Sequence, residues 1–200
     1  MVKYKYMESS NKEEFIKIFK QNVKREGADA LLNWLMSSDF FSAPASSKFH
    51  SAYEGGLCDH SLNVYKRFIK NLQTEYGDNW QEQISLESAT LISLFHDVCK
   101  TNFYKTEMRN VKVNGEWVQQ PYFTVHDTLP YGHGEKSVYI LSGFLKLSRL
   151  EAMCINWHMG GFDTRVMGGS YGIADAYYAY PACVLFHISD LEATYLDEKR

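Results

Sequence analysis

Apolar side chains recur with helical spacing over most of the chain. In residues 1–38 this spacing predicts two helices, separated at Gly27. The first begins at a capping box, Ser10-Asn11-Lys12-Glu13, and its apolar face is formed by Phe15, Ile16, Phe19 and Val23. The second is short, ends near Ser37, and carries Leu31, Leu32, Trp34 and Leu35.

The same spacing predicts helices through the rest of the chain, with two irregular segments between them. One helix runs from an N-cap at Asp59 to about Tyr76, and Ser85 caps another that leads into His96. Two more follow at about 134–147 and 150–158, and a last one starts at Asp175 and is bent or interrupted by Pro181. Residues 39–56 are irregular, and the glycine- and methionine-rich residues 159–174 are expected to form a mobile loop.

Residues 103–130 have a different pattern. Two short β-type runs, 111–113 and 116–118, flank Asn114-Gly115, which is the strongest short signal for a β-hairpin. A third strand is expected at 122–125. The prediction is therefore a mainly α fold: one helical domain over residues 1–200, with a small β-hairpin insertion at about 103–130. Since the insertion follows the His96 helix directly, we hypothesise that it covers a cleft there.

Composition narrows the class of protein. The chain has 200 residues, 45% of them hydrophobic and 22% charged, as is usual for a globular domain. The formal net charge of −3 gives no overall basic surface for nucleic acid. We find no signal-peptide core and no apolar run of transmembrane length, so we expect a cytoplasmic protein without a membrane partner. The four cysteines lack CxxC spacing and are expected to be reduced and partly buried.

The candidate chemistry centres on residues 94–100, Leu-Phe-His-Asp-Val-Cys-Lys. An apolar helix leads directly into His96 and Asp97, and Lys100 follows three residues after the aspartate. If the helix continues, the three polar side chains share one side of it. Burying an aspartate at the end of such a helix is costly unless hydrogen bonds or a cation compensate. A bound metal ion would compensate.

Other candidate ligands lie in or beside predicted helices rather than in polar linkers. Imidazoles and carboxylates without thiolates suit Mn²⁺, Fe²⁺, Co²⁺, Ni²⁺ or Zn²⁺ better than Ca²⁺, and helical bundles often build such sites from inward-facing side chains. In chain order the candidate metal ligands are His60, His96, Asp97, His133, His158 and Asp190.

The order H…HD…H…H…D resembles that of the HD-domain metal-dependent phosphohydrolase superfamily. The segment from Phe49-His50 to Gly55-Gly56-Leu57-Cys58-Asp59-His60 is similar to the opening motif of the branch that includes bacterial 3′-to-5′ exoribonucleases. Residues 96–100 resemble the family's His-Asp-hydrophobic-Gly-Lys, with Cys99 where glycine is usual. Segments 131–134, 155–158 and 185–190 fit its remaining motifs, so the resemblance spans residues 49–197 and implies an HD core there.

The resemblance implies a binuclear site built on the six ligands. One divalent metal would be held by His60, His96, Asp97 and Asp190. The second would be held by His133 and His158, with Asp97 bridging. The ions would be Mn, Fe, Ni, Co, Zn or Mg, and they would activate water for attack on phosphorus. Asp97 and Lys100 are therefore the catalytic candidates, with Lys100 neutralising a phosphate oxygen.

Residues around this set have open alternatives. His50 could contact a substrate phosphate, support a ligand or be structural, while His126 and His187 are read as structural. Arg109 and Lys105 could hold a phosphate or be solvated charges. Four aromatic side chains could stack a nucleobase or simply pack in the core or a lid: Trp117, Trp157, Phe162 and Tyr171.

The leading functional hypothesis is a metal-dependent phosphohydrolase that cleaves a phosphoester of a small nucleotide-like substrate. A 3′-to-5′ exonuclease or other nucleic-acid phosphodiesterase is the alternative within hydrolases, and net negative charge disfavours it. A non-catalytic HD nucleotide-binding module is a different class, which the complete ligand set disfavours. A di-iron HD oxygenase is a further alternative, and Lys100 disfavours it. The pattern does not specify the substrate, the physiological metal or the oligomeric state.

Overall fold

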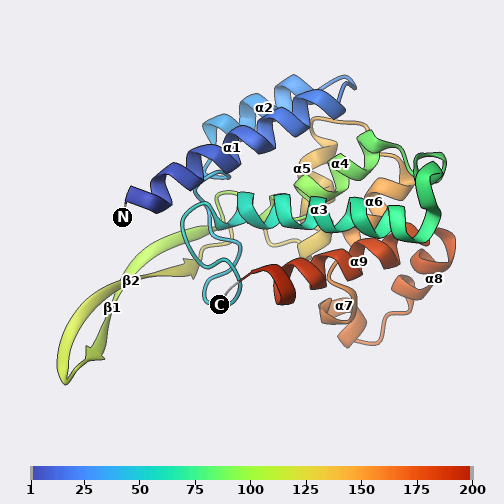
Figure 1. Ribbon diagram of the computed structural model, residues 1–200. Helices are drawn as coiled ribbons and strands as arrows, with labels where there is room; N and C mark the ends of the chain where they lie inside the picture. Colours follow the sequence, from blue (N-terminus) through green and yellow to red (C-terminus); the bar gives the residue numbers. More distant parts are fainter. Residues whose placement is uncertain (1, 199–200) are drawn as a thin grey trace.

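Helices form most of the molecule, and one antiparallel pair of strands extends from it (Figure 1). The computed structural model describes residues 2–198. Within that range it confirms the predicted mainly α bundle with a hairpin insertion. No helix in the described part of the chain is long and apolar enough to cross a membrane.

The longer helices are α1 (Val2–Asn22), α2 (Ala28–Ser37), α3 (Gly56–Tyr76), α4 (Leu86–Phe95), α5 (His133–Ser142), α6 (Arg149–Asn156), α8 (Gly172–Ala179) and α9 (Ala182–Glu192). Short helical segments lie between or after them: η1 (Gly77–Glu82), η2 (Val98–Lys100), η3 (Gly160–Phe162), α7 (Thr164–Met167) and the π-helical η4 (Ala193–Asp197). The strands are β1 (Tyr104–Val113) and β2 (Glu116–Val125).

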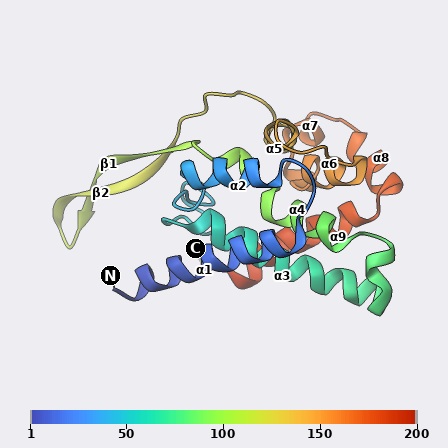
Figure 2. The ribbon, with the colours of Figure 1, turned by 90° about the horizontal axis from the view of Figure 1, so that it is seen from above.

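Helix α3 organises the bundle because it packs against α1, α4 and α9 (Figure 2). Helix α4 lies between α3, α1 and α6, and all its residues from Ala89 to Phe95 are buried. The Phe95 ring lies 5.6 Å from the Phe15 ring and 5.3 Å from the Phe19 ring, measured between centroids. This aromatic core fixes the end of α4, where the candidate chemistry begins.

Two predicted helix starts in the first half of the chain are wrong. Helix α1 begins at Val2, so the capping-box sequence at Ser10 lies inside the helix. Helix α3 begins at Gly56, after Gly55 in the left-handed conformation at φ 84°. The Asp59 carboxylate does not cap the helix. Instead it accepts hydrogen bonds from Asn11 and from the Tyr53 hydroxyl, because these tertiary partners outcompete the local cap.

The predicted mobile loop at 159–174 is also corrected. It contains η3, α7 and the start of α8, and the Asp163 side chain caps α7 by accepting from the Arg165 N–H. The Arg165 guanidinium lies over the Trp157 ring, 4.0 Å from its centroid. These contacts between separate turns give the segment structure without helical periodicity. The break at Pro181, between α8 and α9, is confirmed.

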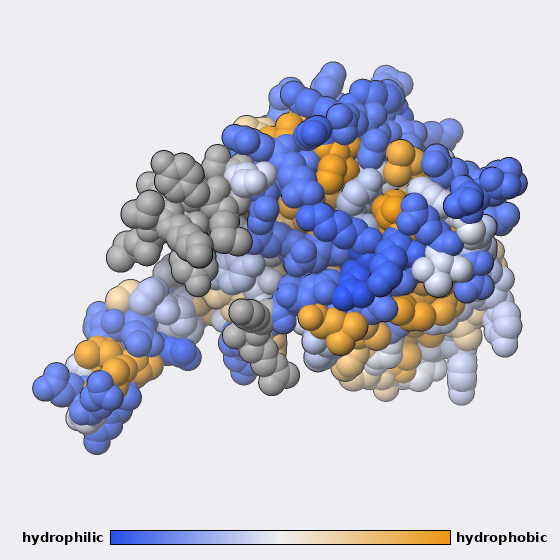
Figure 3. All heavy atoms as spheres, viewed as in Figure 1, coloured by the Kyte–Doolittle hydropathy of each residue, from blue (hydrophilic) through white to orange (hydrophobic). Residues whose placement is uncertain are grey.

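The hairpin pairs Tyr104 with Val125 at its base and turns at Asn114-Gly115, as predicted. The expected third strand at 122–125 is wrong, because those residues belong to β2. The hairpin extends away from the body, with apolar and polar side chains mixed along it (Figure 3). It does not cover the cleft as hypothesised; it contributes only Tyr104, at its base, to the cavity described below.

All four cysteines are free and buried, in agreement with the prediction of reduced thiols. The Sγ atoms of Cys154 and Cys183 lie 3.4 Å apart between α6 and α9.

Candidate metal centre

The end of α4 brings His96 and Asp97 into the middle of the bundle. Helix α4 starts at the Ser85 cap, as predicted, and ends at Phe95. At Asp97 the backbone leaves the helical conformation (φ −102°, ψ 16°) and then turns once through η2. The helix therefore ends before Lys100, contrary to the arrangement expected for a continuous helix. The turn nevertheless brings the Lys100 Nζ within 2.6 Å of Asp97 Oδ2.

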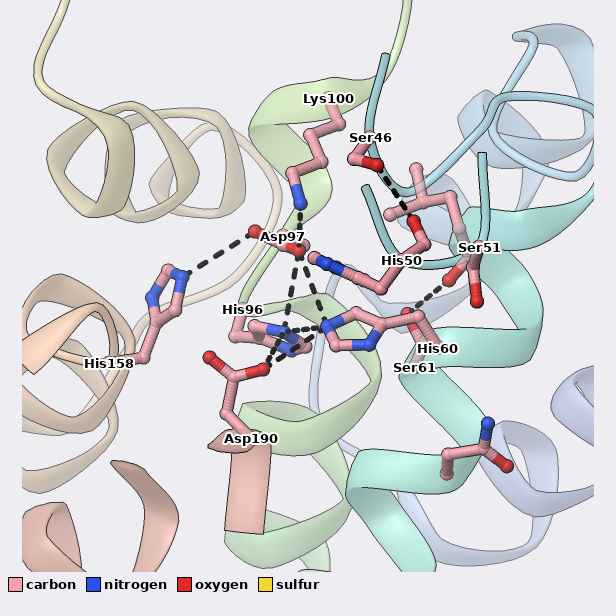
Figure 4. Close-up of polar contacts among 12 residues, drawn as sticks. Ser46, His50, Ser51, His60, Ser61, His96, Asp97, Lys100, His158 and Asp190 are labelled. Atoms are coloured by element: carbon pink, nitrogen blue, oxygen red, sulfur yellow. Dashed lines mark hydrogen bonds and ion pairs between the residues drawn. The ribbon is translucent and has the colours of Figure 1, made fainter. Parts of the chain in front are cut away.

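One oxygen of the Asp97 carboxylate, Oδ2, faces two imidazoles. The Nε2 atoms of His60 and His96 lie 3.5 Å and 3.6 Å from it. These two Nε2 atoms lie 3.2 Å apart. Asp190 Oδ1 is 3.3 Å from His60 Nε2 and 4.0 Å from His96 Nε2. Figure 4 shows these side chains converging from α3, α4 and α9.

This spacing fits a metal ion. With metal–ligand bonds of about 2.0–2.2 Å, neighbouring donor atoms around one ion lie roughly 3.0–3.5 Å apart. The separations above cluster at or slightly beyond that range, and the side chains of His60, His96 and Asp97 are almost completely buried. The clustered histidines and aspartates could therefore hold a metal ion.

The other carboxylate oxygen of Asp97, Oδ1, faces a second pair of histidines. His133 Nε2 is 2.7 Å from it and His158 Nε2 is 3.5 Å from it. His158 Nε2 is buried and has no hydrogen-bond partner among the described residues. A buried polar atom without a partner is costly. A cation on this side of the carboxylate would remove that cost.

The second ring nitrogens of three candidate ligands are held by specific acceptors. His96 Nδ1 lies 2.9 Å from the Ser93 carbonyl, and His158 Nδ1 lies 2.6 Å from the Ile155 carbonyl. His60 Nδ1 lies 2.8 Å from the Glu198 carboxylate. In a neutral imidazole, an acceptor at Nδ1 takes the single ring proton, which leaves the Nε2 lone pair directed at the cluster. This is the tautomer that a metal ligand needs.

Burial and charge shift the pKa values of these groups in opposite directions. Burial alone would lower the pKa of His60, but hydrogen bonds to Asp190 and Glu198 outweigh it and raise that pKa to about 10. Burial lowers the pKa of His96 to about 3. Burial would raise the pKa of Asp97, yet the Lys100 charge and the histidines hold it well below its usual range. The Asp97 carboxylate is therefore ionised, as a metal ligand must be.

A cavity of about 680 Å³ opens over this cluster. Its size lies within the range of small-molecule sites. Lys100, His133 and Asp190 lie in its wall together with residues of the 39–55 segment and of η4. The lining consists of Ala45, Ser46, Ser47, Phe49, His50, His60, Asp97, Lys100, Tyr104, His133, Met159, Phe162, His187, Asp190, Leu191, Thr194, Tyr195 and Glu198.

The structure brings most of the sequence-predicted site residues together. All six candidate ligands and Lys100 lie at the cluster. The His50 ring lies beside the His60 ring, tilted by 46° with the centroids 4.9 Å apart. Arg109 does not join them: it lies on the exposed hairpin, over the Tyr122 ring. Among the four candidate stacking residues, Phe162 lines the cavity. The other three, Trp117, Trp157 and Tyr171, do not.

Three contacts at the site were missed from the sequence. Glu198, which belongs to none of the motifs, bonds to His60. The Cys99 Sγ lies 3.3 Å from His133 Nδ1. His187, read as structural, lines the cavity, and its Nδ1 donates to the His158 carbonyl at 2.6 Å. No local pattern marks Glu198, whereas the two other residues stand inside motifs that carried the resemblance.

Comparisons with protein-family models, with curated proteins and with solved structures give no match for this chain.

Proposed function

We propose that this protein is a metal-dependent phosphohydrolase of the HD-domain type that cleaves a phosphoester of a small nucleotide-like substrate. The observation that carries the proposal is the placement of imidazoles on both sides of one buried carboxylate. The two oxygens of Asp97 face different histidine pairs. A carboxylate flanked in this way suits the bridging position of a two-metal site.

The ligand assignment follows the two sides of Asp97. His60, His96 and Asp190 would hold one divalent ion with Oδ2. His133 and His158 would hold the other with Oδ1. When bound, such ions polarise a phosphate oxygen and lower the pKa of a coordinated water to near neutrality.

Lys100 supplies the positive charge that the chain itself offers to a phosphate. Its Nζ pairs with Asp97 and reaches the cavity wall. Burial would lower its pKa, but Asp97 outweighs burial and raises the pKa above its usual value. The ammonium group is thus permanently charged. It can donate to a phosphate oxygen beside the metal ligands while holding Asp97 in place.

The charges around the cavity support a small substrate rather than a nucleic-acid strand. Among the described lining residues, Lys100 is the one lysine or arginine. A groove that follows a nucleic-acid backbone needs several cations, because each phosphate carries a charge. Arg109 and Lys105, which could extend a basic track, stand on the hairpin outside the cavity.

The test combines metal content with a substrate screen. Wild-type protein reconstituted with Mn²⁺, Fe²⁺, Ni²⁺ or Mg²⁺ is assayed for hydrolysis of nucleoside monophosphates, cyclic dinucleotides and a short oligonucleotide. We expect cleavage of a nucleotide, and Asp97→Asn should abolish both cleavage and metal binding. His126→Ala is the matched control, since His126 lies at the base of the hairpin outside the cluster.

The outcomes separate the hypotheses. Absence of cleavage with every metal would refute the hydrolase. Cleavage of the oligonucleotide alone would favour the nuclease. Full metal retention by Asp97→Asn would refute the bridging assignment.

A further inference from the structure

Three aromatic rings stand exposed in the wall of the cavity. Phe49 is 55% exposed, Phe162 59% and Tyr195 62%, and all three line it. They come from separate segments: the 39–55 loop, η3 and η4. Exposed aromatic rings beside polar ligands offer flat apolar area for a planar group. Phe15, Phe40 and Phe95, in contrast, are fully buried in the core.

The charge of the lining points to the kind of phosphate. Lys100 and three carboxylates, Asp97, Asp190 and Glu198, give it a formal charge of −2 when the histidines are neutral, as they must be to bind a metal. Two divalent ions would change this to roughly +2, which balances a phosphate monoester near its dianionic state. A phosphodiester carries only one negative charge for each phosphate.

We propose that the substrate is a nucleoside monophosphate or a similar aromatic phosphate monoester, and that Phe49, Phe162 and Tyr195 form its base subsite. This inference rests on the proposed function. In the reaction the P–O bond to the nucleoside breaks, water supplies the new oxygen on phosphorus, and its proton passes to the released alcohol. Stacking accepts any flat base, so the subsite favours nucleotides over sugar phosphates and discriminates weakly among bases.

The experiment compares adenosine 5′-monophosphate with ribose 5-phosphate, which carries the same phosphate without the base. Phe162→Leu and Tyr195→Leu remove a ring but keep apolar volume on an exposed surface. Each should raise the KM for the nucleotide about tenfold, the scale of one base–aromatic stack. The kcat for the nucleotide and both constants for ribose 5-phosphate should stay within about twofold. Tyr171→Leu is the control, since Tyr171 is 84% exposed and does not line the cavity.

Other results would overturn the inference. These are equal kcat/KM for the two wild-type substrates, equal losses for both in the variants, or faster hydrolysis of a dinucleoside monophosphate. If no phosphoester is cleaved, the proposed function fails, and calorimetric binding to the Mn²⁺-loaded protein decides the subsite. Weaker binding of the nucleotide by the leucine variants supports it, and unchanged binding refutes it.

A separate observation concerns Glu198. Its side chain is only 2% exposed, and its two carboxylate oxygens have different partners. Oε1 lies 2.8 Å from His60 Nδ1, and Oε2 accepts from the Ser51 hydroxyl at 2.7 Å. His96 and His158 use carbonyl groups only three residues away in the chain. His60 instead uses a charged group 138 residues away.

The geometry points to Glu198 as a positioning residue for His60. A carboxylate on Nδ1 fixes the ring orientation and makes Nε2 a stronger electron-pair donor than a carbonyl does. The hydroxyl of Ser51 holds the carboxylate from its other side, so the glutamate cannot swing away from the ring. This role concerns metal affinity and does not depend on the identity of the substrate.

The test is a Mn²⁺ titration of the metal-stripped protein by calorimetry. Glu198→Ala should weaken binding about 10–100-fold, as is usual for an outer-shell partner of a metal ligand. Glu198→Gln keeps an acceptor for the His60 N–H and should lose less. Asp197→Asn is the control, because Asp197 pairs with Arg67 on the surface. Mn²⁺ affinity within about twofold of wild type in both Glu198 variants would overturn the role. A loss in Glu198→Ala without any recovery in Glu198→Gln would also contradict it, because the graded loss is what distinguishes a hydrogen-bonded support from filled space.

Discussion

The candidate metal centre and the β-hairpin are separated by only three residues, Thr101–Phe103, yet different kinds of contact hold them together. At the centre, buried polar groups from α3, α4, α5, α6 and α9 are held by partners far apart in the chain. In the hairpin, each residue is held mainly by its partner on the neighbouring strand. The first arrangement depends on the entire fold, whereas the second depends on local pairing and a turn. Changes in the two regions should therefore differ sharply in effect.

The largest effect is expected for His96, one of the fully buried candidate ligands. His96→Ala removes a buried imidazole whose Nδ1 is already held by Ser93. Metal content should fall to background. Phosphate release from nucleotides should drop more than about a hundredfold, beyond the 10–100-fold typical of an outer-shell loss. Elemental analysis and a phosphate assay measure this. Retention of metal would show that the cluster does not depend on this residue.

The next largest effect is expected on the free energy of unfolding when a large buried ring is removed from the core. Phe95 is fully buried between Phe15, Phe19 and Phe40. Phe95→Ala should lower the free energy of unfolding by about 3–5 kcal/mol. Trp117→Ala on the hairpin, where the side chain is 71% exposed, should change it by less than about 0.5 kcal/mol. Urea unfolding of the two variants measures the contrast, and similar losses would remove it.

A smaller effect is expected at a buried ion pair away from the candidate metal centre. Burial would raise the pKa of Glu151, but hydrogen bonds from Arg25, the Ser148 N–H and Ser88 outweigh it and lower the pKa below its ordinary value. The stabilisation is therefore complete above the unfolded-state pKa and is lost as pH falls through the folded-state pKa. Glu151→Gln should cost about 1–3 kcal/mol at neutral pH.

The pH profile is the sharper measurement of this pair. Between about pH 6 and about pH 3, the unfolding free energy of wild type should fall more steeply than that of Glu151→Gln. Parallel profiles would mean that Glu151 contributes nothing through its charge.

The smallest effect is expected from shortening the hairpin. Replacing residues 106–123 with Asn-Gly keeps the pairs formed by Tyr104 with Val125 and by Lys105 with Thr124. It also keeps Tyr104 in the cavity wall. The Tm and the nucleotide kcat/KM should stay close to wild type. A large loss of kcat/KM at unchanged Tm would show that the hairpin contributes to the site after all.

Much of the fold could be predicted because its signals are local. Helical spacing located the main helices, and Asn114-Gly115 located the hairpin turn. The predicted helix start was wrong where tertiary contacts override a local cap, as at Asp59. The prediction for residues 159–174 was wrong because individual contacts, such as that of Arg165 with Trp157, hold its turns. Such contacts leave no periodic pattern in the sequence.

The candidate site also contains residues that the sequence could predict and residues that it could not. The positions of the six candidate ligands could be predicted because each stands in a recognisable motif, and the fold brings these residues together. The contact of Glu198 with His60 could not be predicted, because no sequence pattern links a single glutamate to a histidine 138 residues away. Arg109 was named for its charge alone, and charge does not indicate whether a strand points toward or away from a cavity.

The base of the hairpin also has a practical consequence. Because Tyr104 and Val125 are paired neighbours, the chain leaves the body and returns to it at one place. The exposed turn at Asn114-Gly115 therefore offers a point for grafting a fluorophore, an affinity peptide or a whole reporter domain. A label there would follow the protein through purification or imaging without occupying the cavity.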